Sequence, residues 1–233
     1  LVYYLSELVR KNGVIVAQVG EGSDEIFAGY DAYQRAVNLH EKIWKYLERM
    51  PRSLRKIPAA LLGIIPSDRL DFSREYARRL AAGQEPFWGN AIAFSDDQKS
   101  SLLSREYCAT LAPDHAYAII RNRYDQTTTR DPKADFLEQM TYLELKIRLP
   151  ELLLMRVDKM AMAHSIEPRV PFLDTRLVEL AMHIPQSLKF KGGETKHILK
   201  KAVEGIIPND IIYRKKQGFG APVREWLKSK THA

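Results

Sequence analysis

The sequence predicts an α/β fold to which this chain contributes mainly helices and one or two strands. Residues 14–19 form an apolar run with the length and β-branched composition of a strand buried on both faces of a parallel sheet. A glycine-rich turn, 20–24, follows directly, and helical periodicity lies on either side. Helix, strand, glycine turn and helix in this order are typical of part of an α/β unit.

The composition is that of a globular chain with enough apolar residues for a sizeable core. It has 233 residues, of which 45% are hydrophobic and 28% charged. We expect no membrane span and no secretory leader, because neither a run of about 18 apolar residues nor a basic-then-apolar start is present. Cys108 is the only cysteine, which excludes a disulfide framework and fits a reducing, cytoplasmic compartment.

The first part of the chain holds the strand and its neighbours. A helix with apolar residues at helical spacing begins at Val2 and ends at Asn12-Gly13, and a short helix is expected over 25–30. Residues 32–104 have a helical pattern that prolines interrupt. No second strong strand is visible, although one buried parallel strand cannot stand alone. We therefore expect partner strands upstream of Leu1, in a longer protein.

The rest of the chain is expected to be helical around a proline-rich segment. An amphipathic stretch divides at Pro150 into helices near 133–148 and 150–164. Residues 167–174 hold too many prolines for a helix or a strand. Three polar residues are expected to cap the helices that follow: Asp174, Thr195 and Asn209.

The net charge of +7 comes from one end of the chain. Between Lys189 and Lys230 there are 11 basic and four acidic side chains, and the two signs balance elsewhere. Such a segment favours an anionic partner, which is a nucleotide, a nucleic acid or an acidic protein. A solvated basic surface is the alternative that charge alone leaves open.

The turn Gly20-Glu21-Gly22-Ser23-Asp24-Glu25 is the first candidate site. A strand-to-helix junction presents backbone N–H groups to an anion, and glycines let the backbone come close. The turn matches neither the dinucleotide pattern nor a P-loop. Its three acids would repel a bare phosphate, so a phosphate here would need Mg²⁺ between the charges. The alternative is a capped turn whose acids serve the helix dipole.

The basic loop 214–220 is the natural counterpart of this turn. Its lysines and arginine neutralise phosphates, and its glycines allow a loop that closes over a ligand. An exposed basic loop is the alternative. The six histidines show no metal-binding spacing near an acid, so we expect no zinc site.

Three segments carry a family resemblance: VGEGSDEIFAGY at 19–30, LLLMRVDKMAMAHSIEPRVPFLD at 152–174, and RKKQGF at 214–219. Their order, spacing and residue identities resemble those of the synthetase domain of glutamine-hydrolysing asparagine synthetases. The resemblance extends from Leu1 to about Leu227. The resemblance implies an ATP pyrophosphatase fold, which is a doubly wound parallel sheet with a helical C-terminal region. It also implies that residues 1–233 are the C-terminal part of that domain.

The reaction implied by the resemblance has two steps. ATP adenylates the side-chain carboxylate of aspartate and pyrophosphate leaves. Ammonia, which an N-terminal glutaminase domain releases from glutamine, then attacks the β-aspartyl-AMP to give asparagine and AMP. ATP and Mg²⁺ are therefore the implied cofactors, and neither a nucleic acid nor a membrane is an expected partner.

Site residues follow from the resemblance position by position. Glu21 matches the acid needed to form the aspartyl-adenylate, and Asp24 matches the acid associated with Mg²⁺ and pyrophosphate. Lys216 matches the lysine that stabilises negative charge at the α-phosphate or the leaving pyrophosphate. Glu21 and Lys216 are thus the implied catalytic residues. The implied ATP-binding residues are Val19, Gly20, Glu21, Gly22, Asp24 and Lys216.

The chain departs from the family pattern in several places. Val19 stands where Ser is usual, which removes a hydroxyl contact, Ala28 replaces Gly, and Pro168 replaces Ala. The Ser-Gly-Gly-x-Asp-Ser pyrophosphate loop and the glutaminase cysteine do not occur in this chain. Both are expected upstream of Leu1, so we expect that the chain alone cannot catalyse the full reaction.

Two other hypotheses remain open. The same adenylate-forming chemistry could act on another acid or amine, as in β-lactam-forming relatives. The second hypothesis is a protein of another functional class, a helical binding module whose basic C-terminal segment holds nucleic acid or an acidic protein. That segment, however, lacks the interleaved aromatic residues of proteins that bind single-stranded nucleic acid. Missing strands would also expose apolar surface and a sheet edge, so the sequence leaves association into a homodimer open.

Overall fold

The computed structural model describes residues 1–64, 71–90, 92, 94, 96–110, 115–215 and 226. In chain order its elements are α1 (Val2–Lys11), β1 (Val16–Gln18), α2 (Ser23–Ile26), α3 (Asp31–Leu39), the π-helix η1 (His40–Trp44), α4 (Lys45–Arg49), α5 (Arg52–Ile64), α6 (Asp71–Ala82), α7 (Asp96–Leu102), α8 (Arg105–Thr110), α9 (His115–Arg130), α10 (Phe136–Lys146), the π-helix η3 (Leu149–Leu154), α11 (Met155–Met162), β2 (Glu167–Arg169), the 3₁₀-helix η4 (Pro171–Leu173), α12 (Thr175–Met182), α13 (Gln186–Lys189), α14 (His197–Val203) and α15 (Asn209–Ile212).

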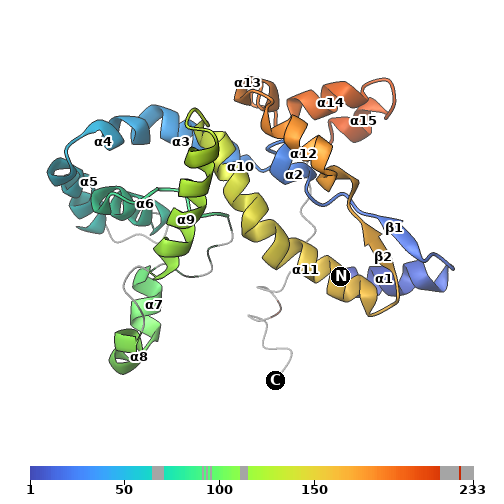
Figure 1. Cartoon of the computed structure of the whole chain (residues 1–233), viewed down its shortest axis with the longest axis horizontal. Helices are drawn as coiled ribbons and strands as arrows, with labels where there is room; N and C mark the ends of the chain where they lie inside the picture. The colour runs from blue at the N-terminus through green and yellow to red at the C-terminus, as the bar shows by residue number, and fades with distance from the viewer. Residues whose placement is uncertain are drawn as a thin grey trace.

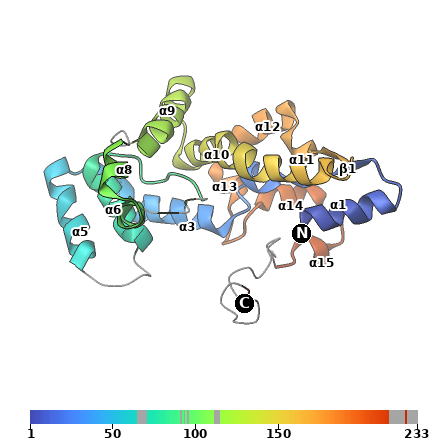
Figure 2. The same cartoon turned by 90° about the horizontal axis from the view of Figure 1, so that it is seen from below.

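A long helical run from α10 through η3 to α11 crosses the middle of the molecule (Figure 1). α3 to α6 and α9 lie on one side of it, and α12 to α15 lie on the other. β1, β2 and α1 lie at the far end of α11, and α1 runs beside α11 (Figure 2). None of the helices that the structure describes is long and apolar enough to cross a membrane.

The two strands pair in parallel, with Val16 opposite Glu167. The partner of β1 therefore lies in the proline-rich segment 167–174, and the expectation of no regular element there is wrong. Pro168 can lie in β2 because its nitrogen, which carries no hydrogen, does not face β1. The Glu167 N–H donates to the Ile15 carbonyl at 2.8 Å, so the next nitrogen, that of Pro168, points away from β1.

β1 is shorter and more exposed than its apolar sequence predicts. Ile15 and Val16 are 60% and 52% exposed, so the expectation of a strand buried on both faces is wrong for this chain. Among the described residues the sheet has only two strands. Burial on both faces of a parallel sheet requires layers on both sides, which two strands do not provide. The α/β expectation therefore holds only as a mostly helical chain with one small parallel sheet.

Two apolar cores meet at residues 26–28, where α2 ends. The first lies between α3, α9 and α10 and includes Tyr33, Phe87, Met140 and Leu143. The second lies between α2, α12 and α14, and its buried residues are Ile26, Phe27 and Ala181. Each large apolar side chain buried in this way stabilises the fold by about 1.5–3 kcal/mol. The segment after the glycine turn is thus held from both sides, which fixes the position of the turn.

Helix boundaries agree with the sequence where a local cap determines them. The Asp174 side chain accepts the Arg176 N–H at 3.0 Å and begins α12, as expected. The helices predicted on either side of Pro150 are present as α10 and α11. The residues around Pro150 form the π-helix η3 between them. α10 begins three residues later than predicted, because Asp135 forms a capping box there. The other two predicted caps are wrong, since the cap residues of α14 and α15 are Lys196 and Pro208.

Candidate active site

The glycine turn 20–24 leads directly from β1 into α2. The Val19 N–H donates to the Arg169 carbonyl at 2.8 Å, so this donor belongs to the sheet. Gly22 has a φ of +92°, a conformation that favours glycine. The Ile26 N–H then donates to the Gly22 carbonyl at 3.0 Å, which starts α2 before the helix expected over 25–30.

Because Gly22 has no side chain, Leu173 of η4 can pack closely against the turn. A Cβ at this position would lie 2.3 Å from Leu173 Cδ2, whereas a Cβ at Gly20 would meet nothing within 4 Å. The segment 152–174 therefore packs directly on the turn, so two of the three resembling segments are neighbours in space.

Gly22→Ala is expected to destabilise the fold by about 1–3 kcal/mol, because a Cβ is strained at left-handed φ and must also displace Leu173. Gly20→Ala is the matched control, since the site is open and its φ lies outside that region. We expect the control to stay within about 0.5 kcal/mol of the wild type. Urea unfolding of both variants measures the difference, and equal stabilities would contradict the packing.

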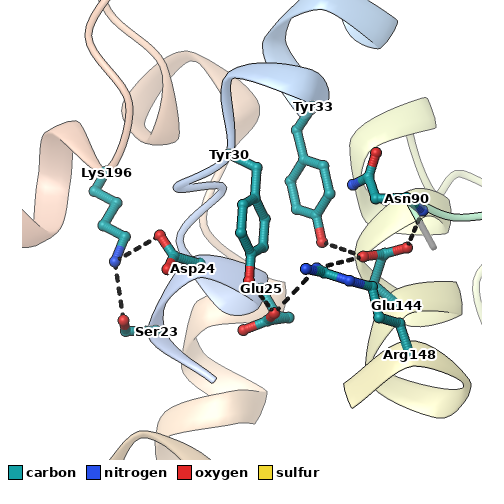
Figure 3. A network of polar contacts seen from close by, with 9 residues as sticks. All are labelled: Ser23, Asp24, Glu25, Tyr30, Tyr33, Asn90, Glu144, Arg148 and Lys196. Atoms are coloured by element: carbon teal, nitrogen blue, oxygen red, sulfur yellow. Dashed lines mark hydrogen bonds and ion pairs between the residues drawn. The ribbon is translucent and has the colours of Figure 1, made fainter. Parts of the chain in front are cut away.

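Glu25 points into the protein, not to solvent (Figure 3). Its side chain is 1% exposed, and its Oε1 accepts hydrogen bonds from the Tyr30 hydroxyl at 2.7 Å and from Arg148 Nη1 at 3.5 Å. Burial raises the pKa of Glu25 above its ordinary value, against the lowering effect of the Tyr30 hydrogen bond and of Arg148. Burial and the bond to Glu25 also raise the pKa of Tyr30.

Arg148 links Glu25 to a second buried carboxylate, Glu144 of α10 (Figure 3). Arg148 Nη1 lies 3.1 Å from Glu144 Oε2, which also accepts the Tyr33 hydroxyl at 3.0 Å. Glu144 Oε1 accepts the Asn90 N–H at 2.8 Å. Two carboxylates share one guanidinium, so the cluster carries one net negative charge when all three groups are ionised. This network ties the turn to α10 and to the loop at residue 90.

Asp24 meets a cation from a distant part of the chain. Lys196 Nζ lies 2.9 Å from Asp24 Oδ1 and donates to Ser23 Oγ at 2.9 Å (Figure 3). Lys196 is the N-cap residue of α14 and lies 173 residues from Ser23 along the chain. This contact joins the turn to the C-terminal helices.

Glu21 differs from the two other acids of the turn. It is part-exposed, and it forms no hydrogen bond or ion pair with any residue that the structure describes. Glu25 and Asp24 each have a basic partner. The turn therefore presents one carboxylate whose charge no described side chain balances.

Four predicted site residues, Gly20, Glu21, Gly22 and Asp24, lie in this turn, and Val19 directly precedes it. Lys216 lies outside the described residues. Sequence analysis missed two basic partners of the turn, Arg148 and Lys196, and the carboxylate of Glu144, which Arg148 links to Glu25. Only the spacing of Glu144 and Arg148, four apart on a helical stretch, is a local sign of the pair. Nothing local connects either of them, or Lys196, to residues 20–25.

Mg²⁺ fits this turn only as an ion that arrives with a phosphate. Among the described residues no group of three or more His, Cys, Asp or Glu could hold a metal ion. Mg²⁺ is usually bound by one or two carboxylates together with substrate phosphates. Glu21 and Asp24 are the carboxylates of the turn that could hold such an ion, and Lys196 pairs with Asp24 in this structure.

Local ion pairs compensate part of the basic C-terminal segment. Lys200 Nζ lies 3.1 Å from Glu194, and Lys201 Nζ lies 2.7 Å from Glu204. With Lys196 on Asp24, three lysines of this segment have acidic partners. Of these three pairs only Lys196–Asp24 uses an acid from outside the segment, so it alone lowers the excess of positive charge that the composition indicates.

The chain is similar to known asparagine synthetases along its whole length. A family model described as asparagine synthase matches residues 1–233. Glutamine-hydrolyzing asparagine synthetase 1 of Bacillus subtilis (strain 168) is 34% identical over 228 residues, which cover 98% of this chain and 34% of the relative. Its asparagine synthetase 3 is 38% identical over 150 residues, which cover 58% of this chain and 24% of the relative.

Amidase chry2 of Gibberella zeae is 25% identical over 238 residues, which cover 98% of this chain and 35% of the relative. No solved structure matches. The chain spans about a third of the length of the curated relatives that match it throughout. Because the family model covers every residue, the chain belongs to the asparagine synthase family.

Proposed function

We propose that residues 1–233 are the C-terminal part of the synthetase domain of a glutamine-dependent asparagine synthetase. Relatives about three times as long support this assignment. The exposed apolar side chains of Ile15 and Val16 support it as well, because parallel strands normally have both faces covered. In the whole protein β1 and β2 would be part of a doubly wound sheet of the ATP pyrophosphatase type.

The proposed reaction begins with adenylation of aspartate. A side-chain carboxylate oxygen attacks the α-phosphorus of ATP, the bond to the β-phosphate oxygen breaks, and pyrophosphate leaves. Ammonia then attacks the acyl carbon of the β-aspartyl-AMP, loses a proton and expels AMP. Adenylation is needed because a free carboxylate has a poor leaving group.

The observation that carries this proposal is the unequal environment of the three acids in the turn. Glu25 and Asp24 are held by Arg148 and Lys196, so they position the turn. Glu21 alone presents its carboxylate without a described counter-charge, which suits the acid that formation of the adenylate requires. Lys216 is assigned to the negative charge that develops on the phosphates. Mg²⁺, when bound, would neutralise phosphate charge beside Glu21 and Asp24.

The test is aspartate-dependent exchange of labelled pyrophosphate into Mg-ATP by the full-length protein that contains this chain. We expect exchange only when aspartate is present. Binding of Mg-ATP without aspartate-dependent exchange would contradict aspartate as the substrate, and a folded protein that binds no Mg-ATP would contradict the adenylation chemistry altogether.

A second candidate is the same chemistry on another carboxylic acid. The match to a fungal amidase over 98% of the chain favours keeping this candidate. Exchange that another acid supports and aspartate does not would establish it.

The remaining assignments concern the whole protein. Glutamine would supply ammonia through an N-terminal glutaminase domain, the location would be cytoplasmic, and a homodimer would cover exposed apolar surface. We also expect the isolated chain to be inactive, because the pyrophosphate loop of the family does not occur in it. Turnover of ATP by the isolated chain at the rate of the full-length protein would contradict this.

A further inference from the structure

Helix α5 carries an apolar row that no described segment covers. Leu54, Ile57 and Leu61 follow one another at helical spacing and are 44%, 55% and 60% exposed. Single exposed aliphatic side chains are ordinary, but three in a row on one helix present a continuous apolar surface. Such a surface indicates a contact that the chain does not make within itself.

A different face of α5 fixes the helix to the rest of the protein. Its half-buried residues are Arg55, Pro58, Ala59 and Leu62, whose spacing defines one side of the helix, and α5 packs against α6. Arg74 Nε of α6 also donates to the Leu62 carbonyl at 3.1 Å. The apolar row is therefore not the surface that holds α5 to the fold, so it is available to a partner.

The surroundings of this row are basic. Residues 41–56 contain six basic and two acidic side chains. Glu41 forms an ion pair with Lys45, and Glu48 Oε2 lies 3.7 Å from His40 Nε2. Four of the basic side chains are exposed and form no ion pair with a described residue: Lys42, Arg49, Arg52 and Lys56. The exposed segment thus carries a net positive charge, which favours an anionic partner.

The exposed side of α5 joins the apolar row to two of these cations. On a helix with about 3.6 residues per turn, the surface leads from Ile57 over Ser53 and Ala60 to Lys56 and Arg52. Long basic side chains can lay their stems along an apolar surface and keep their charges in a polar layer. A basic amphipathic helix of this kind is typical of a helix that lies in the plane of a membrane surface.

The position of α5 in the fold suits a broad, flat partner. α5 lies at the outer edge of the molecule in both views, whereas α2, which follows the glycine turn, lies near the middle (Figure 1, Figure 2). A surface that contacts α5 therefore leaves the turn open.

We propose that α5 binds the surface of an anionic phospholipid membrane. Leu54, Ile57 and Leu61 enter the boundary between the headgroups and the acyl chains, and Arg52 and Lys56 bind the lipid phosphates. The family resemblance implies no membrane partner, so this proposal depends on the surface of α5 alone and not on the proposed function. An acidic protein and a second copy of the chain are the other occupants that the experiment must separate.

The experiment measures co-sedimentation of the full-length protein with vesicles of equal parts phosphatidylglycerol and phosphatidylcholine, and with vesicles of phosphatidylcholine alone. The variant Ile57→Ser/Leu61→Ser removes most of the apolar row. The matched control is Leu180→Ser/Ile206→Ser, which replaces two exposed aliphatic residues of α12 and of the turn after α14, on the other side of α10. Urea unfolding checks that each protein is folded.

The wild type is expected to bind the anionic vesicles at least about tenfold more tightly than phosphatidylcholine, because several cations lie near the lipid charges. Ile57→Ser/Leu61→Ser should weaken this binding about tenfold, and the control should bind as the wild type does. Arg49→Gln/Lys56→Gln should also weaken it about tenfold. Added salt should weaken binding further, because it screens the attraction.

Three results would overturn the proposal: no binding of the wild type to anionic vesicles, an equal loss in the control, or unchanged binding of Ile57→Ser/Leu61→Ser. The first would leave an acidic protein as the occupant. Self-association of the wild type without lipid, abolished in Ile57→Ser/Leu61→Ser and accompanied by no vesicle binding, would assign the row to a second copy of the chain. Pyrophosphate exchange tests the adenylation chemistry separately, so either idea can fail without the other.

Discussion

Glu21→Gln is expected to lower aspartate-dependent pyrophosphate exchange by about 10³-fold, which corresponds to about 4 kcal/mol of transition-state stabilisation. Glutamine keeps the size of the side chain and one acceptor oxygen, but it replaces the other oxygen with an NH₂ donor and removes the charge. Glu21 is the one carboxylate of the glycine turn without a basic partner among the described residues, so its charge is available to the reaction. Initial rates of exchange in the full-length protein measure the loss.

The same variant is expected to fold normally. Because Glu21 forms no hydrogen bond or ion pair with a described residue, its replacement should change the free energy of unfolding by less than about 0.5 kcal/mol. Asp31→Asn is the matched control, since Asp31 is an exposed acid in the first turn of α3 and should exchange pyrophosphate at the wild-type rate. Exchange above a tenth of the wild-type rate in Glu21→Gln would refute the assigned role.

Local signals predicted the parts of the fold that local interactions determine. α1 occupies Val2–Lys11 and ends at Asn12, as its apolar spacing and the Asn-Gly pair indicate, and Asn12 Nδ2 donates to the Leu8 carbonyl at 2.8 Å. The cap of α12 at Asp174 is of the same kind. The position of the glycine turn could also be predicted from the sequence. Closely spaced glycines directly after an apolar strand are compatible with few conformations other than a turn.

Pairing between distant segments could not be predicted in this way. β2 contains Pro168, which argues against a strand unless one knows that its nitrogen faces away from β1. Parallel strands need a long connection, so no turn sequence marks their register. The exposure of β1 was missed for a related reason, since burial depends on layers that the apolar pattern itself does not contain.

The polar contacts of the turn also depend on distant segments that the local sequence does not identify. The sequence places Glu21, Asp24 and Glu25 together but does not show which of them is neutralised. That distinction comes from Arg148 and Lys196, which reach the turn from residues far along the chain. The chemical role of an acid in this turn is therefore determined by tertiary contacts.

Arg148→Met is expected to destabilise the fold by about 3–5 kcal/mol at pH 7, because it leaves the buried carboxylates of Glu25 and Glu144 without their counter-charge. Methionine retains much of the aliphatic stem, so the effect is mainly one of charge. Urea unfolding of the wild type and the variant measures it. The matched control is Arg176→Met, which removes an ion pair with Asp174 at the surface and should leave the unfolding midpoint unchanged.

The destabilisation by Arg148→Met should also depend on pH. Burial raises the pKa of Glu25 even beside the guanidinium, and removal of Arg148 should raise it further. A carboxyl group whose pKa is raised in the folded state binds protons more readily there than in the unfolded chain. Its cost is therefore absent below the unfolded pKa of about 4.3 and complete only above the folded pKa. The stability difference between wild type and variant should therefore shrink as the pH falls from 7 to 5. A difference that does not depend on pH would show that lost packing, and not an uncompensated charge, is the cause.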